Sequence, residues 1–187
     1  MKTGLWIALA ALPLCACTPD YPRLPPLPAQ AAPFTTGDAA FLQQANEHDL
    51  TQVALGKLAA DHARAAEVKD LALSSVKDYE AHRATLATLA GKHDLALTDA
   101  PLARDQATIE RLSKLHGPRF DTAYVTALRD EAQANEKATV SASATLKDGD
   151  LKSAATALQK LDQSRISSAY SWLPHLSTRK HSRGQKR

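Results

Sequence analysis

The sequence predicts an all-α protein, a four-helix bundle with a short extra helix, and three observations carry that prediction. Aromatic residues make up only 5% of the 187 residues, and much of the 44% apolar share is alanine. Such a composition suits thin helices that pack closely, whereas a β-sandwich core is rich in β-branched and aromatic residues. Apolar residues recur at helical spacings of three and four, and no run of alternating β-branched residues occurs.

Two long amphipathic stripes define the first two helices. The first helix should begin around Gly37-Asp38, with Asp38 as its N-cap. Its inner stripe comprises Phe41, Ala45, His48, Gln52, Leu55, Ala59 and His62. The second helix should run from about Ala66 to Lys92. Its inner stripe comprises Val68, Leu71, Ala72, Ser75, Tyr79, His82, Leu86 and Leu89.

A connection over residues 91–101 leads to a shorter helix from Asp105 to Leu115, which Gly117-Pro118 should end. The fourth helix should start near Phe120-Asp121. Its inner stripe comprises Tyr124, Leu128, Glu131, Asn135, Ala138, Ala142 and Leu146.

An acidic turn at residues 148–150 precedes the last helix, which Pro174 should stop. Its inner stripe comprises Leu151, Ala155, Leu158, Leu161, Arg165, Ile166, Ala169, Trp172 and Leu173. Four long amphipathic helices with short joints favour a four-helix bundle.

The N-terminal segment has the features of a secretory signal. Lys2 supplies a positive start, and residues 5–14 form an apolar run that is too short to span a bilayer. The tetrapeptide Leu14-Cys15-Ala16-Cys17 resembles the bacterial lipobox, in which the last cysteine becomes the lipidated N-terminus. We therefore predict a lipoprotein signal peptide over residues 1–16 and lipid attachment at Cys17. Ordinary cleavage near residues 29–31 and a retained anchor are the alternatives.

The rest of the chain divides into a spacer, a domain and a tail. Six prolines lie between Pro19 and Pro33, which predicts an extended Pro-rich tether over residues 17–36. The helical bundle domain should cover residues 37–174, and a basic disordered tail residues 175–187. Thr18 follows Cys17 where an aspartate would suggest retention in the inner membrane, so we expect the outer membrane, facing the periplasm.

Positive charge is concentrated at the C-terminus. The net charge is +3, and five cations lie in the last nine residues, namely Arg179, Lys180, Arg183, Lys186 and Arg187. This tail is either a solvated end or a contact for anionic envelope polymers such as lipopolysaccharide. It carries no interleaved aromatic residues, so no nucleic-acid partner is expected.

Several segments in order resemble the ferritin-like family catalogued as domain of unknown function 4142. They are residues 38–42 (DAAFL), 55–59 (LGKLA), 68–72 (VKDLA) and 120–124 (FDTAY), followed by the acidic turn with Leu151-Lys152. The resemblance implies a secreted or lipid-anchored ferritin-like bundle and little chemistry. Members of the family typically carry an inward glutamate on the first helix and histidines on later ones. This chain departs from that pattern at Gln52, Tyr79, Ala132 and Ser164.

The residues themselves favour a protein without a metal or cofactor. Di-iron bundles use a Glu-x-x-His pair on facing helices, and the chain contains no Glu-x-x-His or Asp-x-x-His. The candidates that remain are Asp78 with His82, a carboxylate and an imidazole four residues apart, and the histidines of the first helix. Each has a purely structural interpretation, as an intrahelical pair or as histidines at the edge of the core.

Glu131 and Asn135 on the fourth helix can meet Gln52, Tyr79 or Arg165 in the interior. A hydrogen-bonded network in an alanine-rich core is the first interpretation, and a small binding pocket is the second. The sequence thus predicts a non-enzymatic envelope lipoprotein, an interaction or stress-related module anchored to the membrane. The alternatives are a metal- or oxidant-handling site around His48, His82 and Glu131, and binding of cell-wall polymers through the tail.

Overall fold

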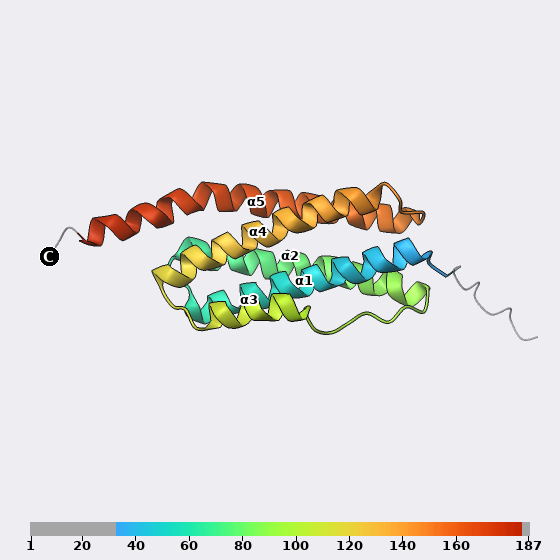
Figure 1. Cartoon of the computed structure of the whole chain (residues 1–187), viewed down its shortest axis with the longest axis horizontal. Coiled ribbons are helices and arrows are strands. Elements are labelled where there is room, and N and C mark those ends of the chain that lie inside the picture. Colours follow the sequence, from blue (N-terminus) through green and yellow to red (C-terminus); the bar gives the residue numbers. More distant parts are fainter. Residues whose placement is uncertain (1–32, 185–187) are drawn as a thin grey trace, which may run out of the picture.

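The computed structural model describes the backbone of residues 33–184 and the side chains of residues 33–175. Its five helices are α1 (Thr36–His62), α2 (Ala66–Lys92), α3 (Ala103–Ser113), α4 (Pro118–Ser143) and α5 (Gly149–Gly184). The four long helices lie side by side as a bundle, and the short α3 lies along one flank (Figure 1). The predicted all-α bundle with a short extra helix is therefore confirmed.

The bundle consists of two helical hairpins. α1 packs most extensively on α2, and α4 on α5, while contacts of α1 with α4 and of α2 with α5 join the hairpins. The long connection after α2 carries α3, which packs against α1 and α4 (Figure 1). One crossover connection between two hairpins is a common arrangement of four-helix bundles.

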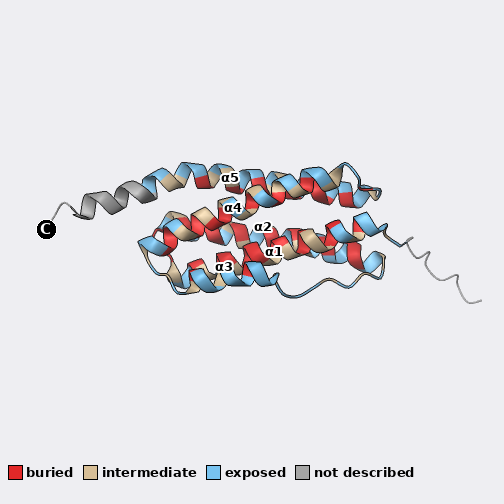
Figure 2. Ribbon diagram, viewed as in Figure 1, coloured by how far each residue is buried: buried red, intermediate tan, exposed pale blue. Residues whose placement is uncertain are grey.

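Polar residues divide the core into two apolar clusters. One cluster, at the end where α1 meets α2, includes Leu55, Val68, Leu112, Phe120, Tyr124 and Leu128. The other, toward the opposite end, includes Phe41, Leu42, Leu86, Leu89, Leu151 and Leu158. Buried residues face inward along all four long helices (Figure 2). All four long helices also place buried polar side chains in the interior.

The start of α1 differs from the prediction. Thr35, and not Asp38, is the N-cap, and its hydroxyl accepts a hydrogen bond from the Asp38 N–H at 3.2 Å. Asp38 is fully buried and accepts the backbone N–H of Lys147 at 2.9 Å. Hydrogen bonds to this carboxylate outweigh the effect of its burial and lower the pKa of Asp38. Asp38 thus holds the loop between α4 and α5.

Asp121 has the same role at the other end of the bundle. Its carboxylate accepts the backbone N–H groups of Arg64 at 2.9 Å and Ala65 at 3.1 Å, just before α2 begins. Residues 38–42 and 120–124 are two of the segments that resemble the family. Each therefore contains an aspartate that fixes a distant loop.

The predicted end of the last helix at Pro174 is wrong, because α5 contains Pro174 and continues to Gly184. Proline removes the N–H that would bond the carbonyl four residues earlier, here that of Tyr170. Tyr170 is 56% exposed, so water can satisfy that carbonyl. The described backbone of residues 175–184 thus belongs to α5, and the disordered tail over residues 175–187 stays a prediction.

The expected signal peptide, Cys17 and nearly all of the tether fall outside the described residues. Within residues 33–184, no helix combines the length and the apolar character that crossing a membrane requires.

Candidate functional site

A layer of buried polar side chains crosses the middle of the bundle. We call it the polar layer, and it comprises His48 and Asp49 from α1, Tyr79 and His82 from α2, Asn135 from α4 and Asp162 from α5. None of the six is more than 8% exposed. Every long helix contributes to this layer, which therefore fixes the register of all four.

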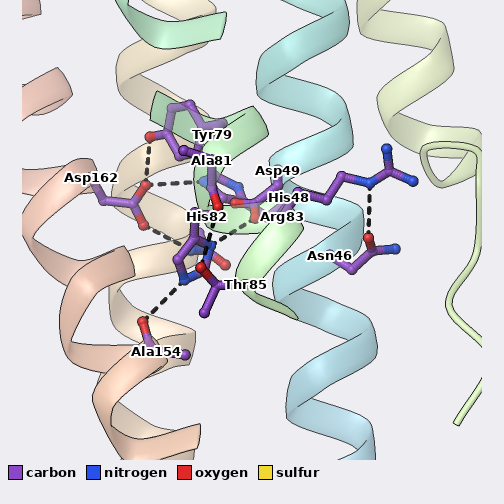
Figure 3. Close-up of polar contacts among 11 residues, drawn as sticks. Asn46, His48, Asp49, Tyr79, Ala81, His82, Arg83, Thr85, Ala154 and Asp162 are labelled. Atoms are coloured by element: carbon purple, nitrogen blue, oxygen red, sulfur yellow. Dashed lines mark hydrogen bonds and ion pairs between the residues drawn. The ribbon is translucent and has the colours of Figure 1, made fainter. Parts of the chain in front are cut away.

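Asp162 is the centre of the polar layer (Figure 3). Its Oδ1 lies 3.0 Å from His48 Nε2 and 2.8 Å from the Tyr79 hydroxyl, and its Oδ2 accepts Asn135 Nδ2–H at 2.7 Å. Because an ionised carboxylate can only accept hydrogen bonds, His48 must be the donor in its contact with Asp162. The proton of His48 is therefore on Nε2. Its Nδ1 is then a free acceptor while the ring is neutral.

His82 joins the second carboxylate to the backbone of α5. Its Nδ1 lies 2.7 Å from Asp49 Oδ2, and its Nε2 lies 3.1 Å from the carbonyl oxygen of Ala154 (Figure 3). Because a backbone carbonyl can only accept, Nε2 carries a hydrogen, and a further proton is shared between Nδ1 and Asp49. The pair is electrically neutral as long as it keeps that proton.

Burial and charge oppose each other at these histidines. Burial disfavours the imidazolium of His48, but the charge and hydrogen bond of Asp162 outweigh this effect and raise the His48 pKa. For His82, burial is likewise outweighed by the hydrogen bond and charge of Asp49, so its pKa is also raised. Both histidines therefore keep their protons to higher pH than a free histidine does.

A cavity of about 790 Å³ opens beside the polar layer, between α1, α3 and α4. We call it the α1–α3–α4 cavity; it is lined by Gln44, Glu47, His48, Leu102, Arg104, Asp105, Thr108, Glu131, Ala134, Asn135 and Ala138. This volume lies within the range of small-molecule sites, roughly 300–1,000 Å³. His48 and Asn135 belong both to the polar layer and to the cavity wall.

Glu131 is the half-buried carboxylate of this cavity. Burial raises the pKa of Glu131, and repulsion from Asp105 adds to the effect, while His48 and Arg104 oppose it. Asp105 itself is buried and is bonded by the Thr51 hydroxyl at 3.3 Å and by Arg104 Nε at 3.2 Å.

The structure separates residues that the sequence grouped. His48 and Glu131 line the α1–α3–α4 cavity, but His82 lines a second cavity of about 480 Å³ between α2 and α5. Asp78 forms an ion pair with Arg165 and not a site with His82. The hypothesised site around His48, His82 and Glu131 is therefore not assembled, whereas Asn135 and Tyr79 do meet in the interior, through Asp162.

The interior does not suit a di-iron centre of the ferritin type. Where typical members present a glutamate, Gln52 contributes a neutral amide, fully buried and without a hydrogen-bond partner among the described residues. Tyr79 donates its hydroxyl hydrogen to Asp162, and Ala132 offers no ligand. Over the part of the chain that is described, no three His, Cys, Asp or Glu side chains are grouped so that they could hold a metal ion.

Sequence reasoning did not single out Asp49 and Asp162, the two acids of the polar layer. Helical spacing could have identified Asp162 as inward-facing, because residues 151, 155, 158, 162, 165 and 169 follow the same spacing of four and three. The prediction placed Leu161 on that stripe, but Leu161 is half-buried and Asp162 is fully buried.

Known proteins share this fold. The family model described as "Domain of unknown function (DUF4142)" matches residues 24–167. The crystal structure of a DUF305 fragment from Deinococcus radiodurans has a TM-score of 0.67 at 14% identity, covering 76% of this chain and 99% of that chain. A DUF305 protein from Streptomyces coelicolor, proposed to be secreted, has a TM-score of 0.56 at 16% identity, covering 79% and 92%. No curated protein matches the chain.

Proposed function

Because the chain belongs to the DUF4142 family, a domain of unknown function, we infer its role from its own site. We propose that it is a non-enzymatic envelope lipoprotein that binds a small polar molecule. The α1–α3–α4 cavity is the observation that carries this proposal. The protein would be an interaction or stress-related module, held at the outer membrane by Cys17 and facing the periplasm.

The arrangement of the histidines favours binding over catalysis. An acid–base catalyst needs a group that is free to exchange a proton with a substrate. Both ring nitrogens of His82 are hydrogen-bonded inside the bundle, so His82 has none free for a substrate. His48 has Nε2 held by Asp162 and only Nδ1 free, and we propose that this nitrogen accepts a hydrogen bond from the ligand. Five of the eleven lining residues of the cavity carry a carboxylate or a side-chain amide, groups that suit recognition of a ligand by hydrogen bonds.

The lipobox supports the location, and so does the similarity in fold to a Streptomyces coelicolor protein that is proposed to be secreted. The test is [³H]palmitate labelling and membrane fractionation of the full chain and of Cys17→Ala. The proposal predicts labelled, membrane-bound protein for the natural sequence and unlabelled, released protein for the variant. Equal labelling of the two proteins would contradict lipid attachment at Cys17.

Binding in the cavity has a separate test. Thermal unfolding of the full chain in detergent is measured with a panel of small cations, anions and neutral polyols, because a ligand that binds only the folded state raises its Tm. Ala138→Trp, which fills the cavity from α4, should abolish the response. Val140→Trp, exposed on the same helix and outside the cavity, is the control and should keep it. If no compound stabilises the protein, the binding role is wrong.

A further inference from the structure

The wall of the α1–α3–α4 cavity carries more negative than positive charge. Glu47 on α1, Asp105 on α3 and Glu131 on α4 supply three carboxylates from three helices, and Arg104 is the one guanidinium among the lining residues. An anionic ligand would meet this excess of like charge, which costs binding energy in a partly desolvated site. The charge balance therefore favours a cation.

Two of the three carboxylates have no hydrogen-bond or ion-pair partner within the part of the chain that the structure describes. Thr51 and Arg104 bond Asp105 at 3.3 and 3.2 Å, but the Glu131 and Glu47 carboxylates form no hydrogen bond or ion pair with any described residue. Glu131 is half-buried, and its raised pKa reflects the cost of holding that charge away from water. A bound cation would remove this cost.

The floor of the cavity adds two neutral acceptors. His48 and Asn135 are only 8% and 7% exposed, and each uses one side-chain atom to bind Asp162. The remaining atoms, Nδ1 of His48 and Oδ1 of Asn135, have no hydrogen-bond partner among the described residues and belong to side chains that line the cavity. Each of these two atoms can therefore accept a hydrogen bond from a ligand in the cavity.

We infer that the α1–α3–α4 cavity binds an organic ammonium ion, with its N–H groups donated to Glu131, Asn135 Oδ1 and the neutral ring of His48. This inference rests on the proposed binding role and specifies its ligand class. An ammonium suits the site because it combines a positive charge with several donors and no acceptor. The described side chains provide no cluster that could hold a bare metal ion, which favours an organic cation.

The test is isothermal titration calorimetry of the full chain in detergent, at low salt and at pH 8, because a higher pH favours the neutral ring of His48, whose Nδ1 can accept. The probes are 1,4-diaminobutane, its neutral analogue 1,4-butanediol and the dianion succinate. The inference predicts binding of the diamine alone. Binding of the diol or of succinate in its place, with the response lost in Ala138→Trp, would overturn the ligand class and leave the binding role intact. Binding of none of these, with no Tm response in the wider panel, would overturn both.

Matched variants locate the site. Glu131→Gln removes the unpaired carboxylate and should weaken diamine binding about tenfold, the loss expected for one charge-assisted hydrogen bond. Glu136→Gln makes the same change on α4 outside the cavity and should leave the affinity unchanged. Arg104→Gln removes the competing cation and should tighten binding about threefold, a gain that a misfolded protein cannot produce. Equal affinities for Glu131→Gln and Glu136→Gln would contradict the site.

Discussion

Asp162 is the residue on which the interior of this bundle depends most. It is fully buried on α5, and its two oxygens accept hydrogen bonds from side chains of α1, α2 and α4. A buried carboxylate is stabilising only where enough donors surround it, and three donors meet that requirement here.

Asp162→Asn should therefore destabilise the fold strongly. The change keeps the shape of the side chain but turns one acceptor into an NH₂ group that faces existing donors. Removing one partner of a buried charged pair lowers the unfolding free energy by about 3–5 kcal/mol. Urea unfolding followed by circular dichroism measures the effect. Asp70→Asn, exposed on α2, is the control and should change the unfolding free energy by less than about 0.5 kcal/mol. Similar values for the two variants would show that the polar layer does not hold the helices.

The same residues predict a pH dependence of stability. The pKa values of His48 and His82 are raised in the fold because Asp162 and Asp49 outweigh the effect of burial. The resulting stabilisation is fully present below the unfolded-state pKa of about 6.5 and is lost as pH rises through the higher folded-state values. Burial also raises the Asp49 pKa, which acts in the same direction at lower pH.

Urea unfolding should accordingly give a larger free energy at pH 6 than at pH 8.5. The double variant His48→Gln, His82→Gln should show a flatter profile over that range, because neither position then titrates. A free energy in the natural protein that stays constant or increases from pH 6 to 8.5 would contradict the raised pKa values of His48 and His82.

Part of this site could be predicted from sequence. Helical spacing identified His48, Tyr79, His82 and Asn135 as inward-facing. It could not identify their partners, because His48 and Asp162 are 114 positions apart and meet only when α1 packs near α5. Periodicity reports which side of a helix is buried, but not what lies across the core.

At the scale of elements, Gly56 sets how closely α1 approaches α2. A Cβ added there would lie 2.6 Å from Val76 Cγ2 and 3.1 Å from the Ala72 carbonyl oxygen. The backbone of α2 cannot move away without disturbing the hairpin, so the position requires the smallest residue.

Gly56→Ala should lower the unfolding free energy by about 1–2 kcal/mol, since overpacking outweighs the gain in helix propensity of about 1 kcal/mol. Gly91→Ala, near the end of α2 with no atom within 4 Å of the new Cβ, should raise it by up to about 1 kcal/mol. Thermal unfolding of the two variants compares them directly. A stabilised Gly56→Ala protein would show that the two helices have room to separate.

The predicted helix boundaries differed from the structure where contacts or solvent exposure in the fold outweighed a local sequence preference. The expected cap at Asp38 is wrong because the Thr35 hydroxyl caps the helix and Asp38 faces the loop at Lys147. Pro174 did not end α5, because the carbonyl four residues earlier belongs to Tyr170, which is exposed to solvent. The positions and faces of the long helices were predictable because their stripes extend over many turns.

At the scale of the whole molecule, the polar layer and the α1–α3–α4 cavity form one continuous feature. The layer joins all four long helices between two apolar clusters, and two of its residues, His48 and Asn135, continue into the cavity wall. A ligand at the cavity would thus contact a side chain whose other polar atom is fixed by Asp162. Binding would then require little rearrangement of the bundle.

Ammonium binding in the α1–α3–α4 cavity is tested most directly by an NMR titration of the full chain in detergent with 1,4-diaminobutane, followed at the histidine ring resonances. We expect saturable shifts of the His48 ring and of backbone amides in α1, α3 and α4, with the His82 ring unchanged because it lines the other cavity. Glu131→Gln should weaken the response, and Glu136→Gln should not. Shifts centred on His82, or an unchanged His48 ring at saturating diamine, would contradict binding in the α1–α3–α4 cavity.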